Sequence, residues 1–267
     1  MEKQYYTGNE IYNNITSAGN AKCNYNNKKI IIKSISAGIV LAIAASVTCV
    51  ATHGVEDYGL AKLISGFTFP VGLIMIVLCG MQLFTSEILD VLNISDNKVK
   101  INKIIKTICL VYLGNLIGTT FMAFLFVNSN QLAMSHNELA HYVFKVANGK
   151  LSIDFMTAFY SGIICNILIC FTVVAYNSAK DVTGKILSIF FPIMAFAISG
   201  VEHCVANMYY LSSAFFATFN PIYTQGVDVT NITINNIIFN NLVPVTIGNI
   251  VGGILVAIII YNSLREK

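Results

Sequence analysis

A chain of 267 residues with 55% hydrophobic and only 11% charged side chains is too apolar for an ordinary soluble domain. Soluble domains carry about 25% charged residues, and the mean hydropathy here is +0.69. These values exclude a soluble enzyme or a nucleic-acid-binding module and indicate an integral membrane protein. The seven cysteines have no metal-type spacing and are interpreted as small packing residues.

Six hydrophobic regions follow one another along the chain, and a membrane-spanning helix needs ~20 such residues. A polar segment, 1–27, precedes them and lacks the apolar core of a signal peptide. Residues 28–267 are therefore expected to form an all-α transmembrane channel domain with six helices. The regions lie near residues 30–52, 61–95, 102–128, 154–178, 186–216 and 237–263.

Lysine and arginine are distributed unevenly between alternate connections. Lys62, Lys145 and Lys150 are the cations of one set. The other set has thirteen: Lys3, Lys22, Lys28, Lys29, Lys33, Lys98, Lys100, Lys103, Lys106, Lys180, Lys185, Arg265 and Lys267. The positive-inside rule then predicts that both termini are cytoplasmic, in what we expect to be a bacterial inner (plasma) membrane.

The two halves of the chain, about 28–128 and 150–264, resemble each other. In each half a Phe-Pro pair precedes a glycine where a polar interruption begins, and a Gly-Asn-x-x-Gly motif lies in a later span. The matching segments are Phe69-Pro70 to Gly80 and Phe191-Pro192 to Gly200, and then 114–118 and 248–252. Three spans per half make the halves face opposite ways, and inverted repeats with broken helices are typical of transporters.

The polar group of the fifth region, "SGVEHCVANM", holds Glu202, His203 and Asn207. Irregular backbone at membrane depth persists only where protein buries it or where it lines a cavity. A charged acid at the bilayer centre costs ~2.5 kcal/mol or more, so we expect Glu202 to be a structural carboxylate that accepts backbone N–H groups at the break. His203, with an ordinary pKa of ~6.5, can hydrogen-bond an anion or lend it a proton.

These motifs resemble the formate/nitrite transporter family from about Lys33 to the last span, whereas residues 1–27 match it poorly. The motifs are "GMQLFTS", the Cys165-Asn166 pair, "SGVEHCVANM" and "PVTIGNIVGG". The resemblance implies an aquaporin-like fold and a homopentamer with one pore in each protomer. It also implies passage of small monovalent anions such as formate, nitrite or hydrosulfide.

The resemblance also assigns site residues one by one. His203 matches the central histidine of the family, with Glu202 and Asn207 as its companions, and Thr85 matches the threonine at the second-helix break. Asn166 matches an asparagine of the fourth span, and Lys150 resembles a vestibule lysine. The cytoplasmic constriction would be Leu83, Phe84 and Ile169, and the outer one Phe69, Leu73 and Phe196. Gln82 departs from the pattern, because many relatives have an acid there.

The predicted mechanism follows from the cost of dehydrating an anion. Lys33 and Lys150, at opposite mouths, would concentrate anions, and proton gain or hydrogen bonding at His203 and Thr85 would carry them past the constriction. The expected partners are the anion, protons and the lipid bilayer, with no cofactor, metal or nucleic acid. Channel and proton-coupled transport remain open, as do two other classes: a water or small neutral-solute channel, and a membrane enzyme that uses Glu202 and His203.

Overall fold

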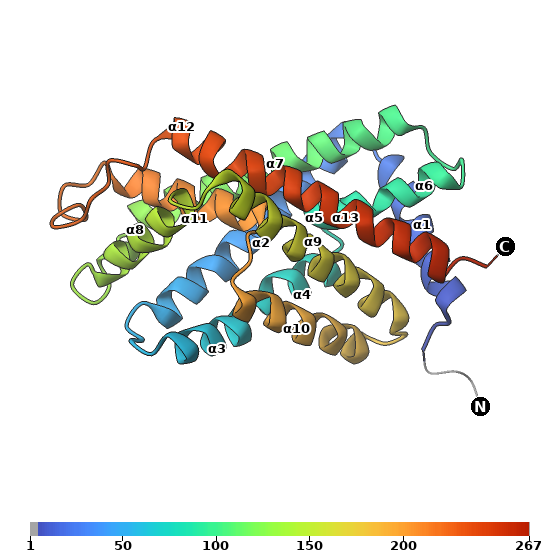
Figure 1. The fold of residues 1–267 in the computed structure, drawn as a ribbon, viewed down its shortest axis with the longest axis horizontal. Coiled ribbons are helices and arrows are strands. Elements are labelled where there is room, and N and C mark those ends of the chain that lie inside the picture. Colours follow the sequence, from blue (N-terminus) through green and yellow to red (C-terminus); the bar gives the residue numbers. More distant parts are fainter. Residues whose placement is uncertain (1–4, 267) are drawn as a thin grey trace.

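The computed structural model describes residues 5–266, and it is almost entirely helical (Figure 1). Six of its helical stretches are long and apolar enough to cross a membrane, which confirms the six predicted spans. These stretches are Asn27–Thr52, Tyr58–Leu78, Ile101–Asn128, Phe155–Ser178, Val182–Ser199 and Ile234–Ser263. Four of them contain the helices α2 (Asn27–Thr52), α7 (Ile101–Asn128), α9 (Phe155–Ser178) and α13 (Val243–Ser263).

The second and fifth hydrophobic regions are broken in the middle, as their polar interruptions predict. In each, a glycine with left-handed backbone follows the end of the helix within two residues: Gly80 (φ +63°) after α4 and Gly200 (φ +68°) after α10. A residue without Cβ adopts this conformation at little cost. The second region contains α3 (Tyr58–Thr68), α4 (Pro70–Leu78), α5 (Phe84–Glu87) and α6 (Leu92–Ser95), and the fifth contains α10 (Val182–Ser199) and α11 (Cys204–Ala217).

The repeated Gly-Asn-x-x-Gly motifs bring two pairs of helices into close contact. A Cβ added to Gly118 of α7 would lie 2.2 Å from the Ile35 carbonyl oxygen of α2. A Cβ added to Gly248 of α13 would lie 2.2 Å from the Phe159 carbonyl oxygen of α9. The same motif therefore seats α7 on α2 in the first half and α13 on α9 in the second.

Residues 8–23, which the sequence analysis treated only as polar, form helix α1 (Gly8–Cys23). A capping box begins it, since the Thr7 N–H donates to the Glu10 carboxylate at 2.7 Å. The helix lies at the same end of the molecule as the C-terminal end of α13, whereas α8 (Glu138–Leu151) lies at the other end (Figure 1). The Thr-x-x-Glu spacing at 7–10 was a usable signal for this helix.

One lysine joins α1 to the segment after the first break. Lys22 Nζ lies 3.0 Å from Glu87 and 3.3 Å from Asp90, two carboxylates that are almost fully buried. Burial alone would lower the pKa of the Lys22 ammonium, but Asp90 and Glu87 raise it, so the lysine stays charged. This ion-pair cluster fixes α1 against the transmembrane helices.

Candidate functional site

A histidine and a threonine from the two breaks meet at the centre of the molecule. Thr85 Oγ1 and His203 Nε2 lie 3.0 Å apart, and both side chains are buried. His203 is the N-cap of α11, where its Nδ1 accepts the Ala206 N–H at 3.1 Å. Because Nδ1 is an acceptor, a neutral ring carries its proton on Nε2 and donates it toward Thr85.

Among residues 5–266, side chains hold the Glu202 carboxylate, and the backbone N–H donors that were expected are not found. Its carboxylate accepts from Lys150 Nζ at 2.9 Å, from Asn207 at 2.6 Å and from Asn241 at 3.4 Å. The expectation was wrong because these partners come from α8, α11 and the sixth span, and the spacing near residue 202 does not reveal them. A cation and two amides neutralise and solvate the buried acid.

Asn115 of α7 satisfies the backbone of the first break. Its Oδ1 accepts the Phe84 N–H at 2.9 Å, and its Nδ2 donates to the Gln82 carbonyl at 3.0 Å. The same Nδ2 also donates to the Ser34 carbonyl of α2 at 2.8 Å. One buried amide thus replaces helical hydrogen bonds that the break removes.

Asn249 of α13 does the same at the second break. It accepts the Cys204 N–H at 3.0 Å and donates to the Glu202 carbonyl at 3.1 Å and to the Gly162 carbonyl of α9 at 2.8 Å. These residues were noticed only as part of a repeated motif. Their role was missed, although an amide at the same place in both halves was a usable signal.

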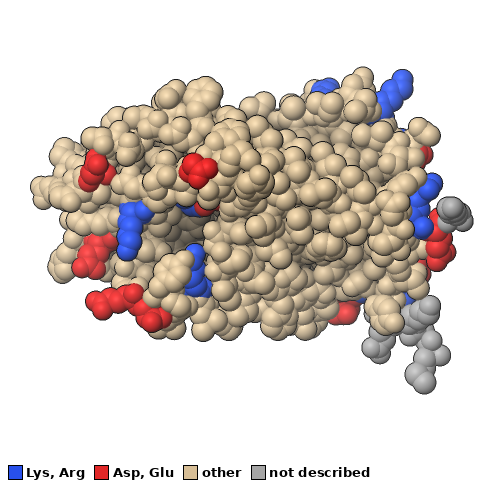
Figure 2. Space-filling model, in the orientation of Figure 1, with Lys and Arg blue, Asp and Glu red and all other residues tan. Residues whose placement is uncertain are grey.

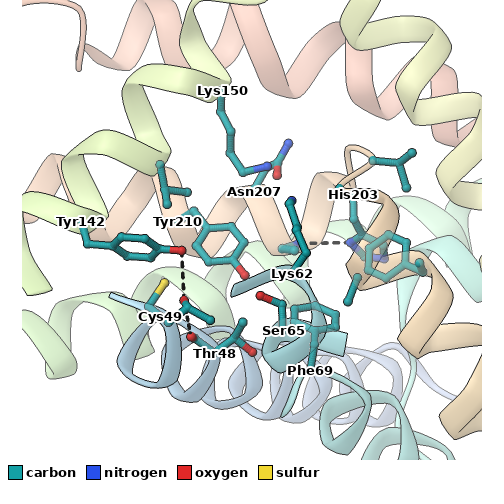
Figure 3. A pocket seen from close by; sticks show the side chains of 17 residues that line it. Thr48, Cys49, Lys62, Ser65, Phe69, Tyr142, Lys150, His203, Asn207 and Tyr210 are labelled. Carbon is teal, nitrogen blue, oxygen red and sulfur yellow. Dashed lines mark hydrogen bonds between the residues drawn. The ribbon is translucent and has the colours of Figure 1, made fainter. Parts of the chain in front are cut away.

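A cavity of about 160 Å³ opens beside His203, and we call it the Lys150 cavity. It would hold several waters, since one needs about 10–15 Å³. Figure 3 shows Lys150, Lys62 and Asn207 projecting into it, with Phe69 and Ser65 at its lower side. In Figure 2 a hollow with basic side chains beside it is visible toward the end that carries α3 and α8.

A second cavity, of about 340 Å³, lies on the other side of the breaks, and we call it the Lys33 cavity. Lys33, Leu83 and Gly80 line it, together with the ion-paired Lys22 and its two carboxylates. Lys33 Nζ donates to the Gly80 carbonyl at the end of α4. The Thr85–His203 contact therefore lies between two cavities that each contain lysine side chains.

The proposed constriction residues are all buried, but they differ in position. Phe69 and Phe196 line the Lys150 cavity with ring centroids 5.7 Å apart, and the Phe196 ring lies 5.9 Å from the His203 ring. Leu83 lines the Lys33 cavity. In the described part of the chain, the other three, Phe84, Leu73 and Ile169, are buried but line neither cavity. The Phe84 ring instead packs against the Tyr112 ring, with centroids 4.9 Å apart.

Two asparagines of the predicted site have structural contacts. Asn166 donates to the Asn249 carbonyl at 2.6 Å, which links α9 to α13. Asn207 lines the Lys150 cavity, and its Nδ2 donates to Glu202 and, at 2.8 Å, to Asn241. The structure thus brings five of the predicted site residues together through contacts at the second break: His203 with Thr85, and Glu202 with Asn207 and Lys150. Asn166 instead contacts the Asn249 backbone.

Six spans with two broken helices around a buried histidine are typical of a membrane channel or transporter. A family model described as formate/nitrite transporter matches residues 9–263. The chain belongs to the formate/nitrite transporter family. The match begins one residue inside α1 and so extends over most of the N-terminal segment, residues 1–27, which was expected to match the family poorly.

Several relatives and solved structures are similar to this chain. The formate channel FocA of Haemophilus influenzae is 35% identical over 234 residues, covering 83% of this chain and 81% of that protein. The formate channel FocA of Escherichia coli K12 is 31% identical over 261 residues, covering 94% and 92%. A pentameric formate channel solved with formate bound is 33% identical, with a TM-score of 0.81 over 88% of this chain and 96% of that one. An FNT family ion channel, 23% identical with a TM-score of 0.83 over 96% and 99%, shares the fold.

Replacing Asn115 by alanine should destabilise the protein by about 3 kcal/mol or more. The substitution leaves the Phe84 N–H and the Gln82 carbonyl buried without a partner, and each such group costs about 1–3 kcal/mol. Thermal unfolding of the purified protein in mild detergent measures the effect. The matched control is Thr119→Val, one turn further along α7, whose hydroxyl donates to two carbonyls of its own helix, those of Asn115 and Leu116. Equal losses in the two variants would contradict the role of Asn115.

Proposed function

We propose that this protein is a membrane channel or transporter for small monovalent anions, of which formate is the first to test. The observation that carries the proposal is the Thr85–His203 contact between two lysine-lined cavities. Related proteins of 31–35% identity are formate channels by name, which supports the same substrate class.

The passage of an anion is limited by dehydration at the buried centre. An anion is drawn into a cavity by unneutralised lysine charge and then meets apolar side chains, where a bare charge is costly. His203 Nε2–H and the Thr85 O–H are the polar hydrogens there, and since the first is donated to the Thr85 oxygen, the Thr85 O–H is the one that points to an arriving anion. A hydrogen bond from them lowers the cost of passage. A proton given by His203 in its charged form does the same: the ring regains a proton from water in the entry cavity, and the acid releases its proton to water in the opposite cavity, where the anion re-forms.

The proposed orientation places both termini in the cytoplasm, so that the Lys150 cavity faces outward. The charge bias of the connections supports it. We also propose a homopentamer with a pore in each protomer, because the similar solved channel is described as pentameric. A particle mass in mild detergent that differs from five chains would contradict that assembly.

Anion flux into liposomes tests the function and the role of His203 together. The wild-type protein should pass formate faster than protein-free liposomes do, with a rate that depends on pH. His203→Asn should keep the fold, because asparagine also caps helices. It should be slower and lose the pH dependence, since the titratable group is gone.

The measurement compares formate and hydrosulfide on both sides of pH ~6.5, the ordinary pKa of histidine. Flux is normalised to the amount of assembled protein. Overlaid pH profiles for the two proteins with both anions would show that His203 does not act on the anion. Passage of water or glycerol without any anion flux would favour the alternative, a neutral-solute channel.

Leu83→Ala and Phe196→Ala should admit larger carboxylates than formate, such as acetate or lactate. Leu83 lines the Lys33 cavity, and Phe196 lies between the Lys150 cavity and His203. Each substitution removes several carbons from a proposed narrow point. Flux of the larger anions relative to formate is the readout, and unchanged ratios in both variants would place the constriction elsewhere.

A further inference from the structure

The charge of Lys150 is already neutralised inside its own cavity. Its ammonium lies 2.9 Å from Glu202, and the Lys150 and Glu202 side chains are only 16% and 10% exposed. The carboxylate is held in place by Asn207 and Asn241, so the pair is fixed. Lys150 and Glu202 together present no net charge to an incoming anion.

Lys62 of α3 lines the same cavity without a carboxylate partner. Within residues 5–266, no Asp or Glu oxygen lies within 4.0 Å of its Nζ. Asp57, five residues earlier, instead caps α3 by accepting the Leu60 N–H at 2.7 Å. The Lys62 ammonium lies 5.5 Å from the centroid of the Tyr58 ring and close to the position that a side chain at residue 200 would occupy.

The position of Lys62 at Gly200 parallels that of Lys33 at Gly80. A Cβ added to Gly200 would lie 2.6 Å from Lys62 Nζ, and one added to Gly80 would lie 3.5 Å from Lys33 Nζ. Each ammonium thus lies against the left-handed glycine that ends a half-helix. Figure 3 shows the Lys62 side chain extending into the cavity between Lys150 and His203.

We propose that Lys62 is the residue that draws the anion into the Lys150 cavity and holds it before it reaches His203. The proposal rests on the proposed function and names a residue for its first step. A cleft lined by an uncompensated cation raises the local concentration of anions. Lys150 has a different task, which is to neutralise Glu202 beside the break.

The test is the dependence of the initial formate flux on formate concentration in proteoliposomes, at low and high ionic strength. Lys62→Gln should raise the half-saturating concentration roughly tenfold at low ionic strength, because the attracting charge is gone. The maximal rate should stay within about twofold, since the charge of Lys62 acts on capture of the anion, before its passage through the centre. High salt should shrink the difference, because the screening length falls from about 30 Å at 0.01 M to about 10 Å at 0.1 M. Lys62→Arg, which keeps the charge, should restore the wild-type half-saturating concentration.

Lys145→Gln is the matched control, because Lys145 is an exposed lysine of the same end of the molecule and does not line the cavity. Its half-saturating concentration should equal that of the wild type. The proposal is overturned if Lys62→Gln behaves like Lys145→Gln. It is also overturned if Lys62→Gln lowers only the maximal rate by the same factor at both ionic strengths, which a structural role at Gly200 would do. If the wild-type protein passes no anion, the proposed function itself fails, and the two failures are therefore distinct.

Discussion

The rest of the structure depends on satisfying the backbone of two broken helices inside the membrane. A bilayer offers no water to an unpaired N–H or carbonyl, so an interruption must find its partners within the protein. Asn115 and Asn249 supply them: at each break the side-chain Oδ1 accepts one backbone N–H, and the Nδ2 group donates to one backbone carbonyl. Both amides also bond to the first span of their own half, Asn115 to α2 and Asn249 to α9. The position of each break is thus fixed relative to the scaffold, and with it the positions of Thr85 and His203.

The close packing of the scaffold serves the same purpose. α7 and α13 approach their neighbours so closely at Gly118 and Gly248 that a methyl group would collide with backbone oxygen. Small residues are what allow such approach between membrane helices. The asparagine lies within the same motif as these glycines, so that its short side chain reaches both the adjacent helix and the break. In each half, the repeated motif therefore both packs two helices closely and supplies the asparagine that bonds to the break.

The sequence predicted the features that depend on local pattern. Hydropathy located the six spans, and the polar interruptions after Gly80 and Gly200 located both breaks, because these signals lie in contiguous residues. The partners of Glu202 could not be predicted in this way, since they come from segments 39 and 52 residues away as well as from α11. The free charge of Lys62 was missed for the same reason. Which lysine of the cavity remains unpaired depends on which one the distant Glu202 carboxylate contacts, and the sequence alone does not distinguish Lys62 from Lys150 in this respect.

The two halves distribute their charges differently around an equivalent backbone. In the second half the residue two positions after the glycine is an acid, Glu202, which forms an ion pair with Lys150. In the first half the corresponding residue is Gln82, which is neutral and needs no cation. The acids there, Glu87 and Asp90, lie further along and are paired with Lys22 of α1. Each buried carboxylate cluster thus uses one lysine, and each cavity keeps another beside its glycine, Lys33 at Gly80 and Lys62 at Gly200. Because residue 82 is a glutamine and not an acid, the ion pairs of the first half form further along the chain, at Glu87 and Asp90. Both mouths of the proposed pathway therefore retain a cation, Lys33 and Lys62.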